Sequence, residues 1–176
     1  MDVFEAIRGR RSIRSYRSEP IPDEDLRKIL EAAIEAPSAG NLQPWVFIVV
    51  RDHATRRALA EAALGQYWMV EAPVIIAVCA NMAVSSKIYG ARGRNLYCIQ
   101  DTAAAIENML LAAYALGYGT CWVGAFYEEE VREVLRLPES LRPVALITLG
   151  KPAEHPVKPE RKPLESVVHF EVYGSR

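Results

Sequence analysis

Residues 95–116 carry the longest helical pattern in the chain, and the chain can adopt only folds that bury this segment. It is rich in alanine, and large apolar residues such as Ile106, Met109 and Leu110 leave it apolar on most faces. A helix that is apolar nearly all round normally lies at the centre of a core or in an oligomer interface. We therefore expect this helix, which Gly117 ends, to be the central packing element.

The rest of the chain predicts short helices and strands around that element. The helix that begins at Asp23 is expected to use this residue as its cap and must end before Pro37, because proline disfavours helical geometry in the residue before it. Residues 81–93 have no clear period and are expected to form a flexible excursion. The other expected helices cover residues 2–9, 53–64 and 128–135, and the expected strands, of which the first two are buried, cover residues 45–50, 74–79, 119–123 and 142–149.

The chain after Gly150 has an unusual composition. Four prolines between residues 152 and 163 keep it extended and non-helical. Residues 167–173 are rich in strand formers, yet a lone strand at the end of an arm has little to pair with in a small domain. Such arms often reach across to a second subunit. Because there is no repeat, low-complexity stretch or interior linker, residues 1–176 are expected to form a single domain.

The composition argues against several classes of function. The formal net charge is only −1, so no global field attracts nucleic acid or anionic lipid. The three cysteines contain no Cys-x-x-Cys pattern, which argues against a disulfide framework or a structural zinc and suits a reducing cytosol. The longest apolar run, residues 72–80, is far shorter than the ~20 residues that span a membrane. We expect a cytoplasmic protein with no metal, no nucleic-acid partner and no membrane segment.

Five arginines lie within ten residues near the start of the chain, at positions 8, 10, 11, 14 and 17. Ser12 adds a hydroxyl donor at their centre, and Arg161 with Lys162 forms a second basic pair. The guanidinium group presents a planar fork of donors that fits phosphate oxygens in pairs. We interpret the cluster as the site for the phosphate end of a cofactor. The alternative is a solvated basic turn, or arginines paired with the acids of residues 23–35.

A second candidate segment is Pro37-Ser-Ala-Gly-Asn-Leu-Gln-Pro-Trp45. Its small residues let a ligand approach the backbone, while Asn41 and Gln43 offer amides that both donate and accept hydrogen bonds. A flavin or pyrimidine edge presents that kind of mixed pattern. The alternative is a plain connection between a helix and a strand.

A third candidate segment, Gly117-Tyr-Gly-Thr-Cys-Trp-Val-Gly-Ala-Phe126, contains several glycines. The glycines follow a helix and enter a strand, which is the reverse of the order in a dinucleotide-binding fingerprint, so we reject a Rossmann site. A Gly-Ala pair at a strand end can instead expose backbone N–H groups to a flat ligand. Cys121 is interpreted as a small buried residue, because no histidine or second cysteine lies nearby in sequence.

With these segments the chain resembles the FMN-dependent nitroreductase family. The resemblance covers essentially the whole chain and implies an α+β fold in which a mainly antiparallel sheet is flanked by helices. It also implies an interlocked homodimer that exchanges C-terminal arms and holds FMN at its interface. The segments that carry it, in the family's order and spacing, are Arg10-Arg-Ser-Ile-Arg14, Pro37 to Trp45, Gly117 to Ala125, and Arg161-Lys-Pro-Leu164.

The resemblance also implies a role for each cofactor-binding residue. By that analogy, Arg10, Ser12 and Arg161, helped by Arg11, hold the FMN phosphate and ribityl chain, while Arg14 approaches the pyrimidine side of the ring. The remaining residues serve the ring and its surroundings: Pro37, Ser38, Ala39 and Asn41 from the other subunit, the backbone of Val123, Gly124 and Ala125 near flavin N5, and Gln66 at the ring edge.

In the family, NAD(P)H stacks on FMN, passes hydride to N5 and leaves before an oxidised acceptor takes its place. This ping-pong scheme implies NAD(P)H as the reductant and a nitroaromatic, quinone or similar small molecule as the acceptor. The cofactor carries the chemistry, and no obligatory acid or base is visible, so no catalytic residue is named. Residues 81–93 are the candidate wall or lid that selects substrates.

Two other functions stay open at this point. One is a relative with different flavin chemistry, such as flavin fragmentation, dehalogenation or enoyl reduction, although the short chain disfavours the insertions that those branches carry. The other is a flavin-binding or redox-sensing protein without turnover. A nucleic-acid module is disfavoured by the neutral charge balance.

Overall fold

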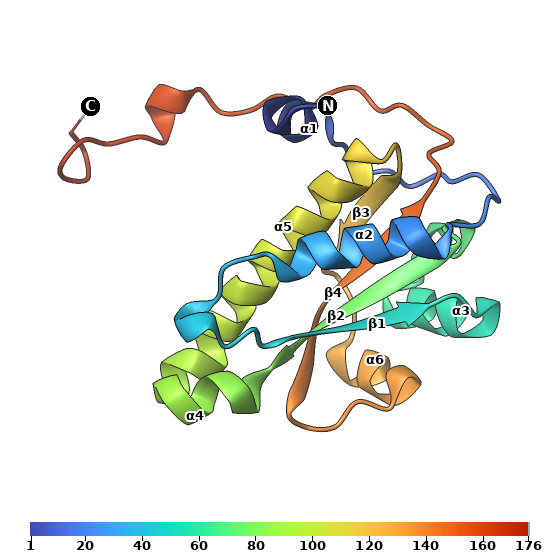
Figure 1. Cartoon of the computed structure of the whole chain (residues 1–176), viewed down its shortest axis with the longest axis horizontal. Helices are drawn as coiled ribbons and strands as arrows, with labels where there is room; N and C mark the ends of the chain where they lie inside the picture. The colour runs from blue at the N-terminus through green and yellow to red at the C-terminus, as the bar shows by residue number, and fades with distance from the viewer. Residues whose placement is uncertain (176) are drawn as a thin grey trace.

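The computed structural model describes residues 1–175 and is built around one antiparallel sheet. The strand order is β1-β2-β4-β3, so the two central strands each pair on both sides. This arrangement confirms the predicted α+β fold with a mainly antiparallel sheet flanked by helices (Figure 1). The strands are β1 (Trp45–Val50), β2 (Val74–Asn81), β3 (Gly119–Val123) and β4 (Leu141–Gly150).

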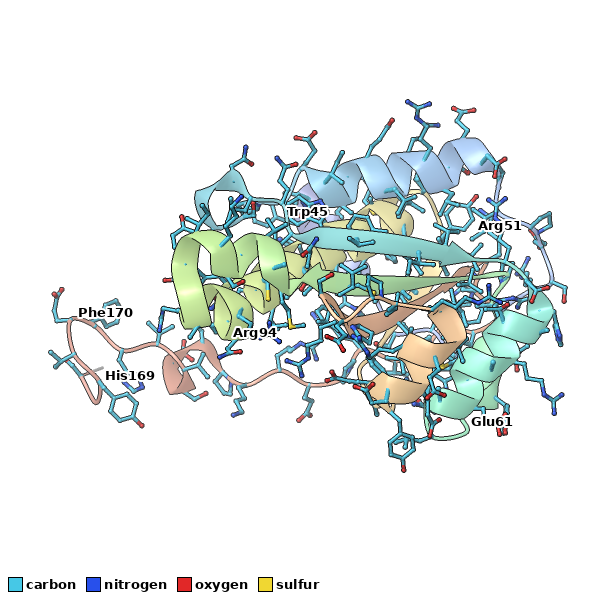
Figure 2. The ribbon with its side chains drawn as sticks, turned by 90° about the horizontal axis from the view of Figure 1, so that it is seen from below. Trp45, Arg51, Glu61, Arg94, His169 and Phe170 are labelled. Atoms are coloured by element: carbon cyan, nitrogen blue, oxygen red, sulfur yellow. The ribbon has the colours of Figure 1, made fainter. Side chains whose placement is uncertain are left out.

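Helices cover both faces of this sheet. Helices α2 (Asp23–Ile34) and α5 (Cys98–Ala115) pack on one face. Helices α3 (His53–Ala62) and α6 (Glu128–Leu135) pack on the other, so the sheet lies between two helical layers (Figure 2). The long apolar helix is confirmed as a central element, because Ile106 and Met109 of α5 are fully buried.

Strand β2 shows how the sequence pattern produces the layers. Successive side chains of a strand point to opposite faces. Ile76 and Val78 therefore enter the core beneath α2 and α5, while Ile75 and Ala77 enter the core beneath α3 and α6. Because helices cover both faces, the strand is apolar throughout rather than alternating. Strand β1 is an edge strand and only half buried over most of its length, so the prediction of a fully buried first strand was wrong.

Strand β3 forms the other edge of the sheet, and the N-terminal segment covers part of it. Helix α1 (Val3–Gly9) leads into this segment, in which Ser12 forms a parallel bridge with Thr120. The Ile13 N–H donates to the Thr120 carbonyl at 2.9 Å. The arginine-rich segment is thus fixed beside a strand of the core.

Two further local predictions were wrong. Residues 81–93 are no excursion, because α4 (Met82–Arg92) fills them, with the Asn81 side chain accepting from the Val84 N–H at 3.3 Å. Asp23 is the first residue of α2 and Pro22 its cap, with no side-chain cap hydrogen bond. Within residues 1–175 the tail contains a short 3-10 turn at Leu164–Ser166 and no strand in the single chain. The strand expected over residues 167–173 would pair with a second subunit, so it stays a prediction.

Candidate functional site

Backbone contacts fix the arginine-rich segment at two places beyond its bridge to β3. The Arg17 N–H donates to the Lys151 carbonyl at 2.9 Å, and Tyr16 bridges Pro152 just after β4. The Tyr16 hydroxyl lies in the core, 2.6 Å from both the Ile13 carbonyl and Thr148 Oγ1. Burial raises the pKa of Tyr16 above its ordinary value, so this hydroxyl remains a neutral donor. These contacts leave the arginine side chains free to point away from the core.

Two carboxylates hold the backbone of the same segment from the outside. Glu154 accepts the N–H groups of Arg14 and Ser15, and Glu71 accepts the N–H of Tyr16 at 3.2 Å. Sequence reasoning missed both residues, because an isolated glutamate far away in the chain carries no local signal of such a contact. The acids therefore bind the main chain between the arginines and leave the guanidinium groups unpaired by them.

Three of the five arginines of the cluster, Arg10, Arg11 and Arg14, line one hollow of about 300 Å³. The structure brings Arg161 from the C-terminal tail to the same hollow, as the sequence predicts. Within the described part of the chain, no acidic residue belongs to its lining. The lining consists of Arg10, Arg11, Ser12, Arg14, Pro156, Val157, Pro159 and Arg161.

The four guanidinium groups have different surroundings. Arg10 lies 3.6 Å from Glu107, and its buried Nε has no hydrogen-bond partner among residues 1–175. Arg11 donates to the carbonyls of Arg8, Gly9 and Arg10 at 2.7–3.0 Å and so closes the C-terminal end of α1. One terminal nitrogen of Arg11 is therefore used to close the helix, which leaves fewer of its donors for the predicted contact with a phosphate group.

Arg14 and Arg161 are more exposed. The Arg14 guanidinium lies 5.8 Å from the ring centroid of Trp68. Arg161 only contacts the carbonyls of Pro159 and Glu160, at 3.3 Å. Neither forms an ion pair with a carboxylate of residues 1–175. Both charges are therefore available to an anion.

The end of strand β3 brings a further set of predicted residues together. The Gln66 side-chain amide donates to the Ala125 carbonyl at 3.1 Å and to the Ala63 carbonyl at 2.9 Å. Val123 is buried, whereas Gly124 and Ala125 are exposed. Because strands rise about 3.3 Å per residue, Gly124 lies about 13 Å along the strand from Thr120, beside which Ser12 is fixed. The Gln66 amide and the Ala125 backbone therefore lie beyond the far end of β3 from the segment that carries the arginines.

The segment Pro37 to Asn41 lies elsewhere in the chain. The Ala39 N–H donates to Asp101 Oδ1 at 3.0 Å, in the first turn of α5, whereas Gly9 of α1 contacts Tyr114 near the last turn. Thirteen residues of helix separate these two points by about 20 Å. One chain does not bring this loop to the arginine hollow, and its contribution from a second subunit stays a prediction.

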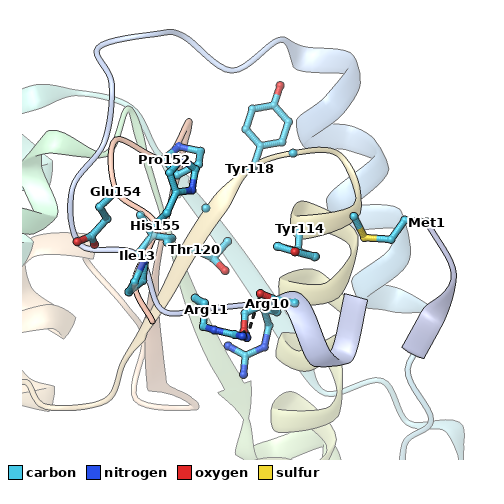
Figure 3. A pocket seen from close by; sticks show the side chains of 14 residues that line it. Met1, Arg10, Arg11, Ile13, Tyr114, Tyr118, Thr120, Pro152, Glu154 and His155 are labelled. Carbon is cyan, nitrogen blue, oxygen red and sulfur yellow. Dashed lines mark hydrogen bonds between the residues drawn. The ribbon is translucent and has the colours of Figure 1, made fainter. Parts of the chain in front are cut away.

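A larger cavity of about 430 Å³ adjoins the arginine hollow and shares Arg10 and Arg11 with it. Figure 3 shows that Tyr114 of α5 lies on one side, while Thr120, Glu154 and His155 lie on the other. The cavity is open between α1, the start of β3 and the segment after β4.

Other kinds of chemistry find no support in the described residues. No three His, Cys, Asp or Glu side chains of residues 1–175 lie together as metal ligands would. Cys121 is buried, and burial raises the pKa of its thiol while the nearby charge of Arg14 opposes that rise. Among residues 1–175, no helix is both long and apolar enough to cross a bilayer.

Comparisons with known proteins extend these observations. The family model described as "Nitroreductase family" matches residues 7–69 and 62–151. An NADH dehydrogenase of Thermus thermophilus is 38% identical over 195 residues, covering 96% of this chain and 95% of its own. The FMN reductase (NAD(P)H) of Bacillus subtilis is 33% identical, covering 98% and 74%. The NADPH:FMN oxidoreductase of Vibrio harveyi, solved with NAD⁺, has a TM-score of 0.90 at 30% identity, covering 99% and 79%.

Proposed function

Because the chain belongs to the nitroreductase family, we propose that it is an NAD(P)H-dependent oxidoreductase that uses FMN. NADH or NADPH is the reductant in this proposal, and a nitroaromatic, quinone or similar small molecule is the acceptor. Two substrates that use one surface in turn give ping-pong kinetics. The names of the relatives from Bacillus subtilis and Vibrio harveyi, both of which mention FMN, support the choice of flavin.

The observation that carries the proposal is the arginine hollow. Four guanidinium groups and the Ser12 hydroxyl meet there, with no acid in the lining among the described residues. The buried Nε of Arg10 lies 3.6 Å from Glu107 Oε1, too far for a hydrogen bond, and it has no hydrogen-bond partner among residues 1–175. A buried donor without such a bond costs about 1–3 kcal/mol. A phosphate group supplies the charge-assisted acceptors that this set of donors lacks. Arg10, Ser12 and Arg161, with Arg11, fit the phosphate end of FMN.

The flat part of the cofactor fits the surface that continues along β3. Arg14, which lines the hollow, lies over Trp68, and its charge suits the pyrimidine side of a reduced flavin. The Gln66 amide and the exposed backbone of Gly124 and Ala125 lie further along, with Val123 buried beneath them. These groups suit the polar edge of the ring, because they supply both donors and acceptors.

A homodimer completes the site in this proposal. The loop Pro37, Ser38, Ala39 and Asn41 is remote from the hollow of its own chain, so its contact with flavin requires a second copy. The exposed apolar side chains of α1, such as Phe4 at 60% and Ile7 at 53%, suit a subunit interface, as do those of the tail, such as Phe170 at 64%. The extended tail can then reach the second subunit as an arm.

When bound, FMN accepts hydride from NAD(P)H at N5 and delivers reducing equivalents to the acceptor. The residues of this chain bind and orient the cofactor, and the arginine charges favour its reduced, anionic form. No side chain of the described site is required as an acid or base. Helix α4, in place of the expected excursion, is the proposed wall that selects the substrate that stacks on the ring.

Steady-state turnover tests this function. The purified protein, loaded with FMN, is mixed with NADH or NADPH, and nucleotide oxidation is followed with menadione or nitrofurazone as acceptor. We expect an acceptor-dependent rate and parallel lines in double-reciprocal plots at several acceptor concentrations. Flavin uptake without any acceptor-dependent rate would indicate a flavin-binding or redox-sensing protein and would reject the enzyme.

A further inference from the structure

The loop of residues 38–43 is locally strained. Gly40 has φ 59°, and two residues with side chains, Asn41 and Gln43, have φ 55° and φ 50°. Residues with a Cβ adopt this left-handed region at a cost, and they stay there only when their surroundings fix them. Inside the loop, the Asn41 N–H donates to the Ser38 carbonyl and the Gln43 N–H to Ser38 Oγ, at 2.9 and 3.0 Å. These bonds close the turn without attaching it to the core.

Asp101 of α5 supplies that attachment. Its Oδ1 accepts the Ala39 N–H at 3.0 Å, while the side chain as a whole is buried, at 7% exposure. Its Oδ2 is also buried and has no hydrogen-bond partner among residues 1–175. A buried carboxylate with a spare oxygen is costly for the free chain, and burial raises its pKa. A residue that destabilises the free chain in this way is expected to serve another function of the protein.

We propose that Asp101 is a positioning residue, which holds residues 38–43 in the strained conformation that contacts the flavin of the second subunit. This inference rests on the proposed function. It assigns Asp101 no contact with flavin, because the carboxylate acts through the Ala39 N–H. Tyr89 of α4 packs beside Gly40 and supports the loop from its other side, since a Cβ at Gly40 would lie 2.6 Å from the Tyr89 hydroxyl oxygen.

If Asp101 has this role, removing its carboxylate should weaken the binding of flavin. Without an acceptor at residue 101, the Ala39 N–H loses its partner and the loop relaxes toward ordinary dihedral angles. Flavin must then restore the strained conformation. Its apparent affinity is the intrinsic affinity multiplied by the fraction of molecules whose loop still has the conformation that binds flavin. The fold itself depends little on this bond, because the loop lies outside the two apolar cores.

A pair of substitutions with the same branching of heavy atoms, one polar and one apolar, tests the proposal. Asp101→Asn keeps an oxygen acceptor for the Ala39 N–H, whereas Asp101→Leu removes it. The affinity for FMN is measured with flavin-depleted protein, by titration with FMN and quenching of its fluorescence. We expect Asp101→Asn to lie within threefold of the parent protein and Asp101→Leu to bind at least tenfold more weakly. Equal affinity for the Leu and Asn variants, or a loss as large for Asn as for Leu, would overturn the positioning role.

A further variant and a second measurement keep the test decisive if one variant does not fold. Asp101→Ala removes the acceptor without adding an apolar branch, so it replaces the Leu variant if that chain does not fold. In the flavin-free Leu or Ala variant, hydrogen exchange should be faster than in the parent over residues 38–43 and unchanged in β2, while the Asn variant should exchange like the parent. Unchanged exchange in the loop of the Leu or Ala variant would also overturn the proposal. The parent protein separates the two hypotheses. If it takes up no FMN, the proposed function fails, whereas if parent and variants bind FMN equally, only the role of Asp101 fails.

Discussion

At the scale of single residues, the site depends on a cluster of guanidinium groups, of which Arg14 and Arg161 form no ion pair with a carboxylate of residues 1–175. The sequence predicts that the arginine cluster and Arg161 form an anion site, because the charge and hydrogen-bonding groups of a side chain follow from its residue type alone. It does not predict that Arg11 closes α1, or that Glu154 and Glu71 bind the backbone between the arginines. The two glutamate contacts join residues more than fifty positions apart, so only the folded chain brings them together. The Arg11 contacts are local, but the sequence does not show whether this side chain turns back onto the helix end or outward to a ligand.

Arg10→Ala tests the phosphate site. The substitution removes a charged donor from the hollow, so we expect FMN affinity to fall at least tenfold, in line with about 1.5–3 kcal/mol for hydrogen bonds to charged groups. Arg17→Ala is the matched control, because Arg17 belongs to the same cluster, lies outside the hollow and is 63% exposed in its side chain. Equal retention of flavin by the two variants after gel filtration would count against the site.

Gly40→Ala tests the packing between the loop and α4. The new Cβ meets the Tyr89 hydroxyl and the backbone has φ 59°, so we expect a loss of about 1–3 kcal/mol in unfolding free energy. Gly117→Ala is the control, because φ is 79° there and no atom lies within 4 Å of the added Cβ. Denaturant unfolding of both should place Gly40→Ala below Gly117→Ala, and the reverse order would contradict this packing.

At the scale of elements, the sheet and its helices follow from the pattern of apolar residues, but α4 does not. Gly90 has φ 56° and ψ −139° and breaks the helical geometry of α4. A π-helical turn at Gly93–Tyr97 then joins α4 to α5. The two glycines therefore looked like an irregular loop, although Asn81 supplies a helix cap. The strand-forming composition of residues 167–173 has no neighbour to pair with in one chain, so local propensity alone does not form a strand.

Tyr16→Phe tests how the N-terminal segment is attached to β4. The substitution removes a buried hydroxyl that lies 2.6 Å from the Ile13 carbonyl and from Thr148 Oγ1. We expect unfolding free energy to fall by about 1–2 kcal/mol and flavin affinity to fall with it, because Ile13 lies between Ser12 and Arg14. Tyr127→Phe, at a residue that is 57% exposed, should change neither quantity. Equal stability of the two variants would show that this hydroxyl does not anchor the segment.

At the scale of the whole molecule, two apolar cores on one sheet bury several neutral titratable groups. Burial raises the pKa of the Cys79 thiol from 9.0 to about 11. Burial, together with the hydrogen bond to Asp25, raises that of the Tyr118 hydroxyl from 10.0 to about 12. The folded chain keeps these protons at a pH at which the unfolded chain releases them. The contribution of these two groups to stability is therefore fully present below about pH 9 and is lost as the pH rises toward 12.

Thermal unfolding between pH 7 and pH 11 measures this loss. We expect the unfolding temperature to stay nearly level up to about pH 9 and then to fall. Cys79→Ala removes one of the groups responsible, so the variant should lose less stability than the parent between pH 9 and pH 11. An unfolding temperature that is constant up to pH 11, or a variant with the same slope as its parent, would contradict the role of these buried groups.

The visible absorption spectrum of the purified protein tests the flavin site most directly. The arginine hollow and the end of β3 predict yellow protein that binds one FMN per chain, releases it on heating, and loses its absorption when NADH or NADPH is added without oxygen. Colourless protein that takes up no FMN from solution, in a sample whose folding is confirmed by circular dichroism, would contradict it.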